Sequence, residues 1–241
     1  MTLARRTVAE ATATALLLAA VVGSGIMGDR LAGGNVAVAL LANTLATGAV
    51  LVALILTFGP ISGAHLNPAV TLAAAWERGL PWSEVPHYVA AQLVGAVIGV
   101  AVADLMFGLS AFSVSHHGRS GSAQLLSEFV ATFGLLSVIW GCSRLRSSTV
   151  VAFAVAAYIT AAYWFTASTS FANPAVTFAR SLTDTFAGIR PVDVPGFIVA
   201  QLLGAMAATG LFRWLVPTLP AAAPRLVARG LESVARRGRE G

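Results

Sequence analysis

The chain has 241 residues, of which 57% are hydrophobic and only 10% are charged. Soluble domains carry about 25% charged residues, so this composition excludes an ordinary soluble protein. The net charge of +5 does not indicate a nucleic-acid partner, because the sequence has no basic module with interleaved aromatic residues. We therefore expect an all-α membrane protein in contact with the lipid bilayer.

Six apolar stretches are each close to the roughly 20 residues that a helix needs to cross a bilayer. The predicted spans lie at residues 8–28, 36–59, 86–108, 123–142, 148–168 and 195–216. All the basic residues are arginines, and the predicted topology places eleven of them on one side of the membrane and four on the other. The side with more arginine is the cytoplasmic one, so both termini are expected in the cytoplasm. The four external arginines are Arg30, Arg119, Arg180 and Arg190.

The second half of the chain repeats the first. Asn-Pro-Ala-Val-Thr at 67–71 recurs unchanged at 173–177, and Glu10 has a counterpart in Glu128 within the first span of the second half. Each half has three spans, and an odd number makes the two halves face opposite ways in the membrane, as in inverted repeats. The single predicted domain, 1–241, then divides into repeat 1 at about 5–108, repeat 2 at about 123–216 and a cytoplasmic tail at 217–241.

After each Asn-Pro-Ala motif comes a segment, about 67–78 and 173–184, that is too short to cross a bilayer. Asparagine is a favoured helix N-cap and proline is favoured at the first helical position, so each motif predicts the start of a re-entrant half-helix. Irregular backbone at this depth is tolerated only inside protein or beside a water-filled cavity. The motif residues expected at such a pore are Asn67, Pro68, Ala69, Asn173, Pro174 and Ala175.

The two half-helices are expected to meet near the midplane with their N-termini together. Each N-terminus carries about half a positive charge, so a pore between them repels cations, including hydronium. The side-chain amides of Asn67 and Asn173 can donate a hydrogen bond to a passing oxygen. Glu10 and Glu128 are costly within a span unless they find donors in the protein interior. We expect both to brace the re-entrant loops by accepting hydrogen bonds from backbone N–H groups.

The stretch Ser-Gly-Ala-His-Leu-Asn-Pro-Ala-Val-Thr at 62–71, together with the second Asn-Pro-Ala motif, resembles the aquaporin family, also called major intrinsic proteins. The resemblance covers about residues 5–216 and includes the paired glutamates. It implies six tilted transmembrane helices with two half-helices, passive conduction of small neutral solutes through each subunit, no cofactor, and assembly as a homotetramer. The expected location is a bacterial inner membrane.

In most members of that family an arginine directly follows the second Asn-Pro-Ala motif and forms a narrow external filter, but this chain has Val176 there. The family's motif spacing suggests Thr47, Ala161 and Ser170 as the other filter residues. Arg180 lies one helical turn further along, about 6 Å further outward, and is expected at the external vestibule rather than in the filter; the alternative is that its side chain reaches into the pore. A filter of small, uncharged side chains without the arginine is expected to be wide enough for small polyols and some water. Members of the family that lack this arginine resemble bacterial proteins associated with neutral metalloid acids such as arsenous acid, so the resemblance implies passage of these solutes as well.

Several other residues have expected places. His65 precedes the first motif and, by the resemblance, lines the cytoplasmic half of the pore. Tyr163 and Trp164 are expected in an aromatic belt at the membrane interface. The external connection at 109–122, which contains Arg119, is expected as a solvated loop.

Two alternative functions share parts of this pattern. A strictly water-selective channel would carry the same motifs, and a coupled transporter would also use inverted repeats and broken helices. The transporter, however, would normally need carboxylates near the midplane to bind its driving ion, whereas Glu10 and Glu128 are expected as loop braces. An intramembrane enzyme or a metal site is not expected, because no predicted span holds a cluster of His, Cys or Asp residues.

Overall fold

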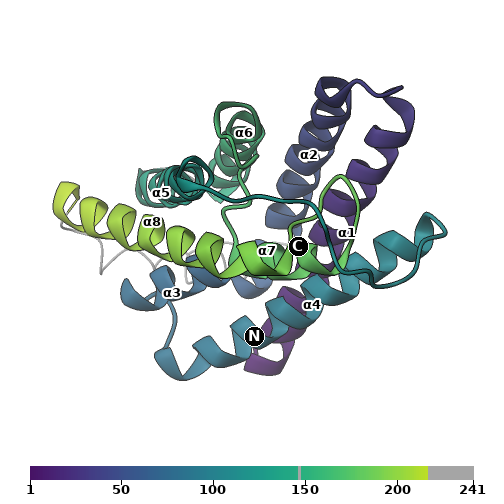
Figure 1. The fold of residues 1–241 in the computed structure, drawn as a ribbon. Helices are drawn as coiled ribbons and strands as arrows, with labels where there is room; N and C mark the ends of the chain where they lie inside the picture. Colours follow the sequence, from purple (N-terminus) through teal and green to yellow (C-terminus); the bar gives the residue numbers. More distant parts are fainter. Residues whose placement is uncertain (146–147, 217–241) are drawn as a thin grey trace.

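The computed structural model describes residues 1–145 and 148–216, and the regular structure within these ranges is helical, as predicted (Figure 1). The long and short helices are α1 (Leu3–Leu31), α2 (Val36–Ser62), α3 (Pro68–Trp76), α4 (Val85–Met106), α5 (Ser122–Leu145), α6 (Ser148–Phe165), α7 (Pro174–Ala179) and α8 (Val194–Leu215). Single 3-10 turns lie at 82–84, 180–182 and 191–193. The predicted tail at 217–241 lies outside the described residues.

Five of the described helices, α1, α2, α4, α5 and α8, are long and apolar enough to cross a membrane. The sixth predicted span, α6, has 18 residues, or about 27 Å of helix, which is near the lower limit for a span. It ends at Phe165, before the predicted 168, where the sequence changes to Thr-Ala-Ser-Thr-Ser at 166–170. Hydroxyl side chains bond to nearby backbone and compete with helix continuation, as Thr166 does by donating to the Ala162 carbonyl at 2.6 Å.

The two half-helices are shorter than predicted. α3 has nine residues and α7 has six, and each begins at the motif proline after an asparagine N-cap. α7 continues directly into the 3-10 turn at 180–182, so the second re-entrant segment tightens before it turns back along the chain. This tighter turn decides where the side chains after Val176 lie.

The packing of the helices follows the internal repeat. In the first half α1 lies against α2 and α4, and in the second half α5 lies against α6 and α8 in the same way. The halves meet where α2 contacts α6, α4 contacts α7 and α3 contacts α8. Figure 1 shows α7 near the middle of the molecule with long helices around it. The half-helices therefore lie between the two halves, where an inverted repeat places its site.

Glycines bring the paired helices close together. A Cβ added at Gly95 of α4 would collide with the backbone carbonyl of Ala11 in α1. At the matching place in the second half, a Cβ at Gly204 of α8 would collide with the carbonyl of Phe129 in α5. Small residues are typical of helix contacts in membranes, because association there depends on close van der Waals packing.

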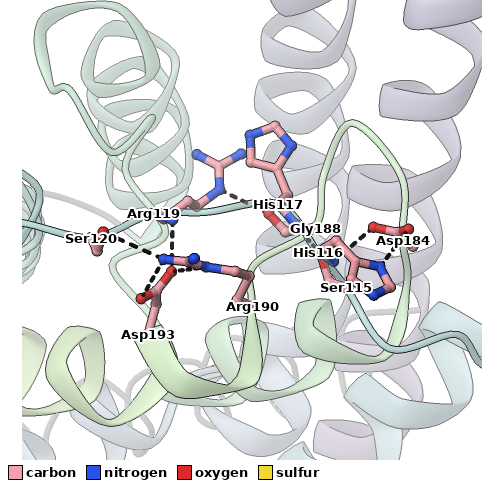
Figure 2. Close-up of polar contacts among 9 residues, drawn as sticks. All are labelled: Ser115, His116, His117, Arg119, Ser120, Asp184, Gly188, Arg190 and Asp193. Atoms are coloured by element: carbon pink, nitrogen blue, oxygen red, sulfur yellow. Dashed lines mark hydrogen bonds and ion pairs between the residues drawn. The ribbon is translucent and has the colours of Figure 1, made fainter.

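The external connection is exposed along most of its length, as expected, but it is also attached to the rest of the protein, and Ser115 and Arg119 within it are buried. Its backbone donates from Ser113 to the Leu182 carbonyl at 2.9 Å and from Ser115 to the Ser181 carbonyl at 3.1 Å. Further along, Arg119 is buried, and its backbone N–H donates to Asp193 at 2.8 Å. Figure 2 shows this connection lying against the chain that follows α7. The sequence missed this contact because the two segments are about 70 residues apart.

Candidate functional site

The chain just before each half-helix has an unusual backbone. Ala64 and Leu66 have φ values of 46° and 51°, and Ser170 and Ala172, 106 residues later, have φ values of 51° and 48°. Non-glycine residues rarely adopt this left-handed conformation, and they keep it only where the surrounding structure enforces it. The same strain at matched places in both halves indicates a shared structural purpose.

Two buried glutamates hold these segments. Glu10 accepts hydrogen bonds from the Ser62 hydroxyl at 2.6 Å and from the backbone N–H groups of His65 and Leu66 at 2.9 and 2.7 Å. In the second half, Glu128 of α5 accepts from the backbone N–H groups of residues 171 and 172, both at 2.8 Å. These are the loop N–H groups that the sequence predicted as partners of the two glutamates. Each carboxylate thus offsets the cost of bending the backbone at membrane depth.

A glutamine completes each brace, and the sequence did not predict its role. Gln92 of α4 donates to Glu10 at 2.8 Å and to the Thr71 hydroxyl of α3 at 2.9 Å. Gln201 of α8 makes the same pair of contacts with Glu128 and Thr177, at 2.6 and 2.7 Å. The signal was present in the recurrence of Ala-Gln-Leu at 91–93 and 200–202. The glutamines tie each half-helix to the long helix that follows it.

The two motif asparagines tie the halves to each other. The Asn67 side chain caps α3 by accepting from the Ala69 N–H at 2.9 Å and donates to the Ala172 carbonyl in the other half at 2.7 Å. Asn173 caps α7 in the same way and donates to the Leu66 carbonyl at 2.7 Å. One of the two N–H groups of each amide is therefore used structurally, and the other is available to a solute.

A cavity of about 260 Å³ runs past these asparagines. Apolar side chains from the long helices form one part of its wall, including Leu17, Leu51, Leu135 and Val155. The re-entrant segments at 63–67 and 170–173 form another part of the wall and supply polar groups, and further polar side chains come from Thr47, Tyr163 and Arg180. The cavity thus offers both hydrocarbon contact and hydrogen bonding along the same path.

Most of the residues predicted for the pore line this cavity. The structure brings together Asn67, Asn173, His65, Thr47, Ser170 and Val176. Pro68, Ala69, Pro174 and Ala175 are buried in the half-helix starts and do not line the cavity. Nδ1 of the His65 ring lies 3.2 Å from the Thr71 hydroxyl of α3, and this contact fixes the orientation of the ring.

Ala161 was wrongly placed in the filter. It lies on the exposed face of α6 and does not line the cavity. The lining residues of α6 recur every fourth position, at Val151, Val155, Ile159 and Tyr163. Counting two residues off along a helix rotates a side chain by about 200°, which moves it to the opposite face.

Tyr163 was also wrongly assigned, since it is buried at the cavity and not in an interfacial belt. Its hydroxyl lies 3.3 Å from the Thr47 hydroxyl, and both residues line the cavity. Trp164, the next residue, is exposed on the outer face. The wall of the cavity therefore carries an aromatic side chain next to Thr47, one of the residues expected in the filter.

Arg180, which was expected outside the filter, lines the same cavity as Val176. The residue is buried, with 2% of its surface exposed. Its guanidinium carbon lies 3.5 Å from the centre of the Phe171 ring, and its Nε donates to the Ala187 carbonyl. Side chains on a helix lean toward its N-terminus, so a long side chain one turn beyond Val176 reaches back toward that level.

Six long helices, two capped half-helices and a cavity where the halves meet, all within the described residues, define an inverted-repeat membrane channel. The family model for major intrinsic proteins matches residues 1–149 and 141–237. The chain therefore belongs to the major intrinsic protein family, which contains the aquaporins.

Individual relatives support the same assignment. The chain is 56% identical to the aquaglyceroporin AqpS of Rhizobium meliloti (strain 1021), over 89% of this chain and 91% of that protein. It is 31% identical to the probable aquaporin AqpM of Archaeoglobus fulgidus, over 89% of this chain and 98% of that protein. The X-ray structure of the aquaglyceroporin from Plasmodium falciparum has the same fold, with a TM-score of 0.69 at 20% identity, covering 90% of this chain and 99% of that one.

Proposed function

We propose that the chain is a passive channel for small uncharged solutes, namely small polyols such as glycerol, neutral metalloid acids such as arsenous acid, and some water. The observation that carries the proposal is the mixed apolar and polar lining of the cavity. A polyol has a hydrocarbon backbone and a row of hydroxyl groups, and the cavity offers apolar side chains and hydrogen-bonding groups together. Family membership and the similarity to an aquaglyceroporin support the same class of solute.

The contacts of the buried carboxylates support passive conduction. Coupled transport needs carboxylates that can bind and release a driving ion within the membrane. Glu10 and Glu128 are instead occupied by loop N–H groups and glutamines. Neither glutamate belongs to the cavity lining. The deep acids therefore serve the structure of the pore, and a solute moves down its own gradient.

Arsenous acid fits the same chemistry as glycerol. It is a neutral molecule at neutral pH with three hydroxyl groups, so it can exchange its water shell for the same hydrogen-bonding wall. The channel is proposed to act as a homotetramer in a bacterial inner membrane with both termini in the cytoplasm. The exposed apolar faces of the long helices, such as Leu45, Leu126 and Phe153, are suited to lipid or to neighbouring subunits.

The test is the permeability of proteoliposomes to water, glycerol, urea and arsenous acid, measured side by side by stopped-flow light scattering and arsenic uptake. Protein-free liposomes give the background for each solute. We expect glycerol and arsenous acid to enter several times faster than background, without accumulation above the external concentration. An increase for water alone would indicate a water-selective channel, and accumulation that depends on an ion gradient would indicate a coupled transporter.

A further inference from the structure

We propose that Arg180 is the specificity-determining cation of the outer part of the pore: its free guanidinium N–H groups bond the oxygen of a neutral solute, and its charge excludes cations. The proposal rests on the proposed function, because it assigns the selectivity of that same cavity to a particular side chain. It replaces the expectation that the position of Val176 leaves the outer pore without a charge.

The first argument is the hydrogen bonding of Arg180. Its Nε is held by the Ala187 carbonyl, and its guanidinium lies on the Phe171 ring at 3.5 Å. Its Nη1 is buried and has no hydrogen-bond partner among the described residues. A buried charged N–H group without a partner is costly. Because the side chain lines the cavity, a solute or water oxygen in the cavity is the natural acceptor.

The second argument is the set of groups around it. The Ser170 hydroxyl is also buried without a partner within the described part of the chain, and Ser170 lines the same cavity as Arg180. The hydroxyls of Thr47 and Tyr163 contribute a further pair to the same wall. Together these side chains offer one cationic donor and three hydroxyl groups, which suits a molecule that carries several hydroxyls.

A second buried arginine, Arg119, shows how a purely structural arginine differs from Arg180. Arg119 also contacts the Phe171 ring, at 4.9 Å, but its N–H groups are used. It donates from Nε to the Gly188 carbonyl at 2.8 Å and from Nη1 to the Ser168 carbonyl at 3.2 Å. Figure 2 shows Arg119 and Gly188 within the contacts of the external connection. Arg119 does not belong to the cavity lining, so it holds the loop before Ser170, while Arg180 faces the solute.

The charge has a direct consequence for selectivity. A unit positive charge a few ångströms from the path raises the barrier to a second cation, and the low dielectric of a buried site strengthens this effect. A neutral polyol experiences no such barrier and gains hydrogen bonds. Arg180 is therefore expected to reject hydronium and alkylammonium ions while it admits molecules with several hydroxyl groups.

The test compares Arg180→Leu with the wild-type channel in proteoliposomes, using entry of methylammonium and a proton-sensitive dye as readouts of cation exclusion. We expect Arg180→Leu to raise both cation fluxes about tenfold, the change that removing a nearby unit charge gives at an intermediate dielectric. Arg180→Gln is the second variant if the leucine protein does not fold. Arg30→Gln is the matched control, because Arg30 is an exposed arginine outside the cavity and its loss should change neither flux.

A relocation variant adds a positive test. Combining Arg180→Leu with Val176→Arg moves the charge back by one turn, and we expect cation exclusion to return. Wild-type glycerol entry reports the proposed function, whereas the cation leak of the variants reports the role of Arg180, so the two can fail separately. Cation fluxes of Arg180→Leu and Arg180→Gln equal to those of the wild type would overturn the assignment.

Discussion

The brace at Glu10 gives the strongest quantitative prediction. In Glu10→Gln one carboxylate oxygen becomes an NH₂ group, which cannot accept hydrogen bonds. Because each oxygen accepts two hydrogen bonds, from Ser62 and His65 on one side and from Leu66 and Gln92 on the other, two donors lose their acceptor whichever way the amide turns. A hydrogen bond to a charged group contributes about 1.5–3 kcal/mol, so the loss is about 3–6 kcal/mol.

This loss is measurable in the purified protein. A change of 1 kcal/mol shifts Tm by about 2–4 °C for a chain of this size, so Glu10→Gln should lower Tm by at least about 6 °C. Thermal unfolding in detergent, followed by tryptophan fluorescence, measures the shift, and glycerol permeability should fall with it because the first re-entrant loop loses its shape. Glu84→Gln is the control: it breaks only the partly exposed ion pair with Arg6, which contributes about 1 kcal/mol or less. A Tm within about 2 °C of wild type, with unchanged glycerol entry, would refute the bracing role of Glu10.

Three further predictions concern packing, the pore wall and pH. Gly204→Ala should destabilise the protein in thermal unfolding, because its Cβ meets the α5 backbone, whereas Gly210→Ala on the same helix meets open space and should be neutral; equal Tm values would contradict the close packing. Ile159→Trp should reduce glycerol flux toward the protein-free rate, whereas Ala161→Leu on the outward face should not; equal effects would contradict the assigned phase of α6. Hydrogen bonds from the backbone and ring of His116 lower the pKa of Asp184 in the folded protein. The stabilisation that these bonds give the folded state is therefore fully present above the ordinary carboxyl pKa of about 4, and it is lost as the pH falls through the lowered pKa of Asp184. Amide exchange at 113–117 should therefore stay slow down to about pH 4, and fast exchange already at pH 6 would contradict this attachment.

The motif chemistry was predictable because it is local and occurs twice. An asparagine cap followed by proline starts a helix wherever it stands, and the repeat of Asn67 at Asn173 placed two such starts in one molecule. The same repetition identified Glu10 and Glu128 as a matched pair with one role. The sequence did not show that each asparagine also donates to the carbonyl of the other half, because this contact joins residues more than 100 positions apart.

The pore wall beyond the motifs was harder to predict, since it depends on helix phase and side-chain direction. On α6 the prediction was two residues off: it chose Ala161, which is exposed, whereas Tyr163 lies on the buried face. Arg180 was placed by the rise of its backbone alone, whereas its long side chain lines the same cavity as Val176, because a helical side chain extends beyond the level of its own backbone. The burial of Arg119 depends on a loop that lies against distant chain, and no local pattern in 109–122 indicates that partner.

Glycerol entry into proteoliposomes, compared between the wild type and Ile159→Trp, tests the central claim most directly, because it asks whether solute passes through this particular cavity. The structure predicts glycerol entry well above the protein-free rate for the wild type. In Ile159→Trp, the tryptophan side chain should fill the cavity between Val155 and Tyr163, and glycerol entry should fall close to the protein-free rate. Wild-type entry no faster than in protein-free liposomes, or undiminished entry in Ile159→Trp, would contradict conduction of glycerol through this cavity.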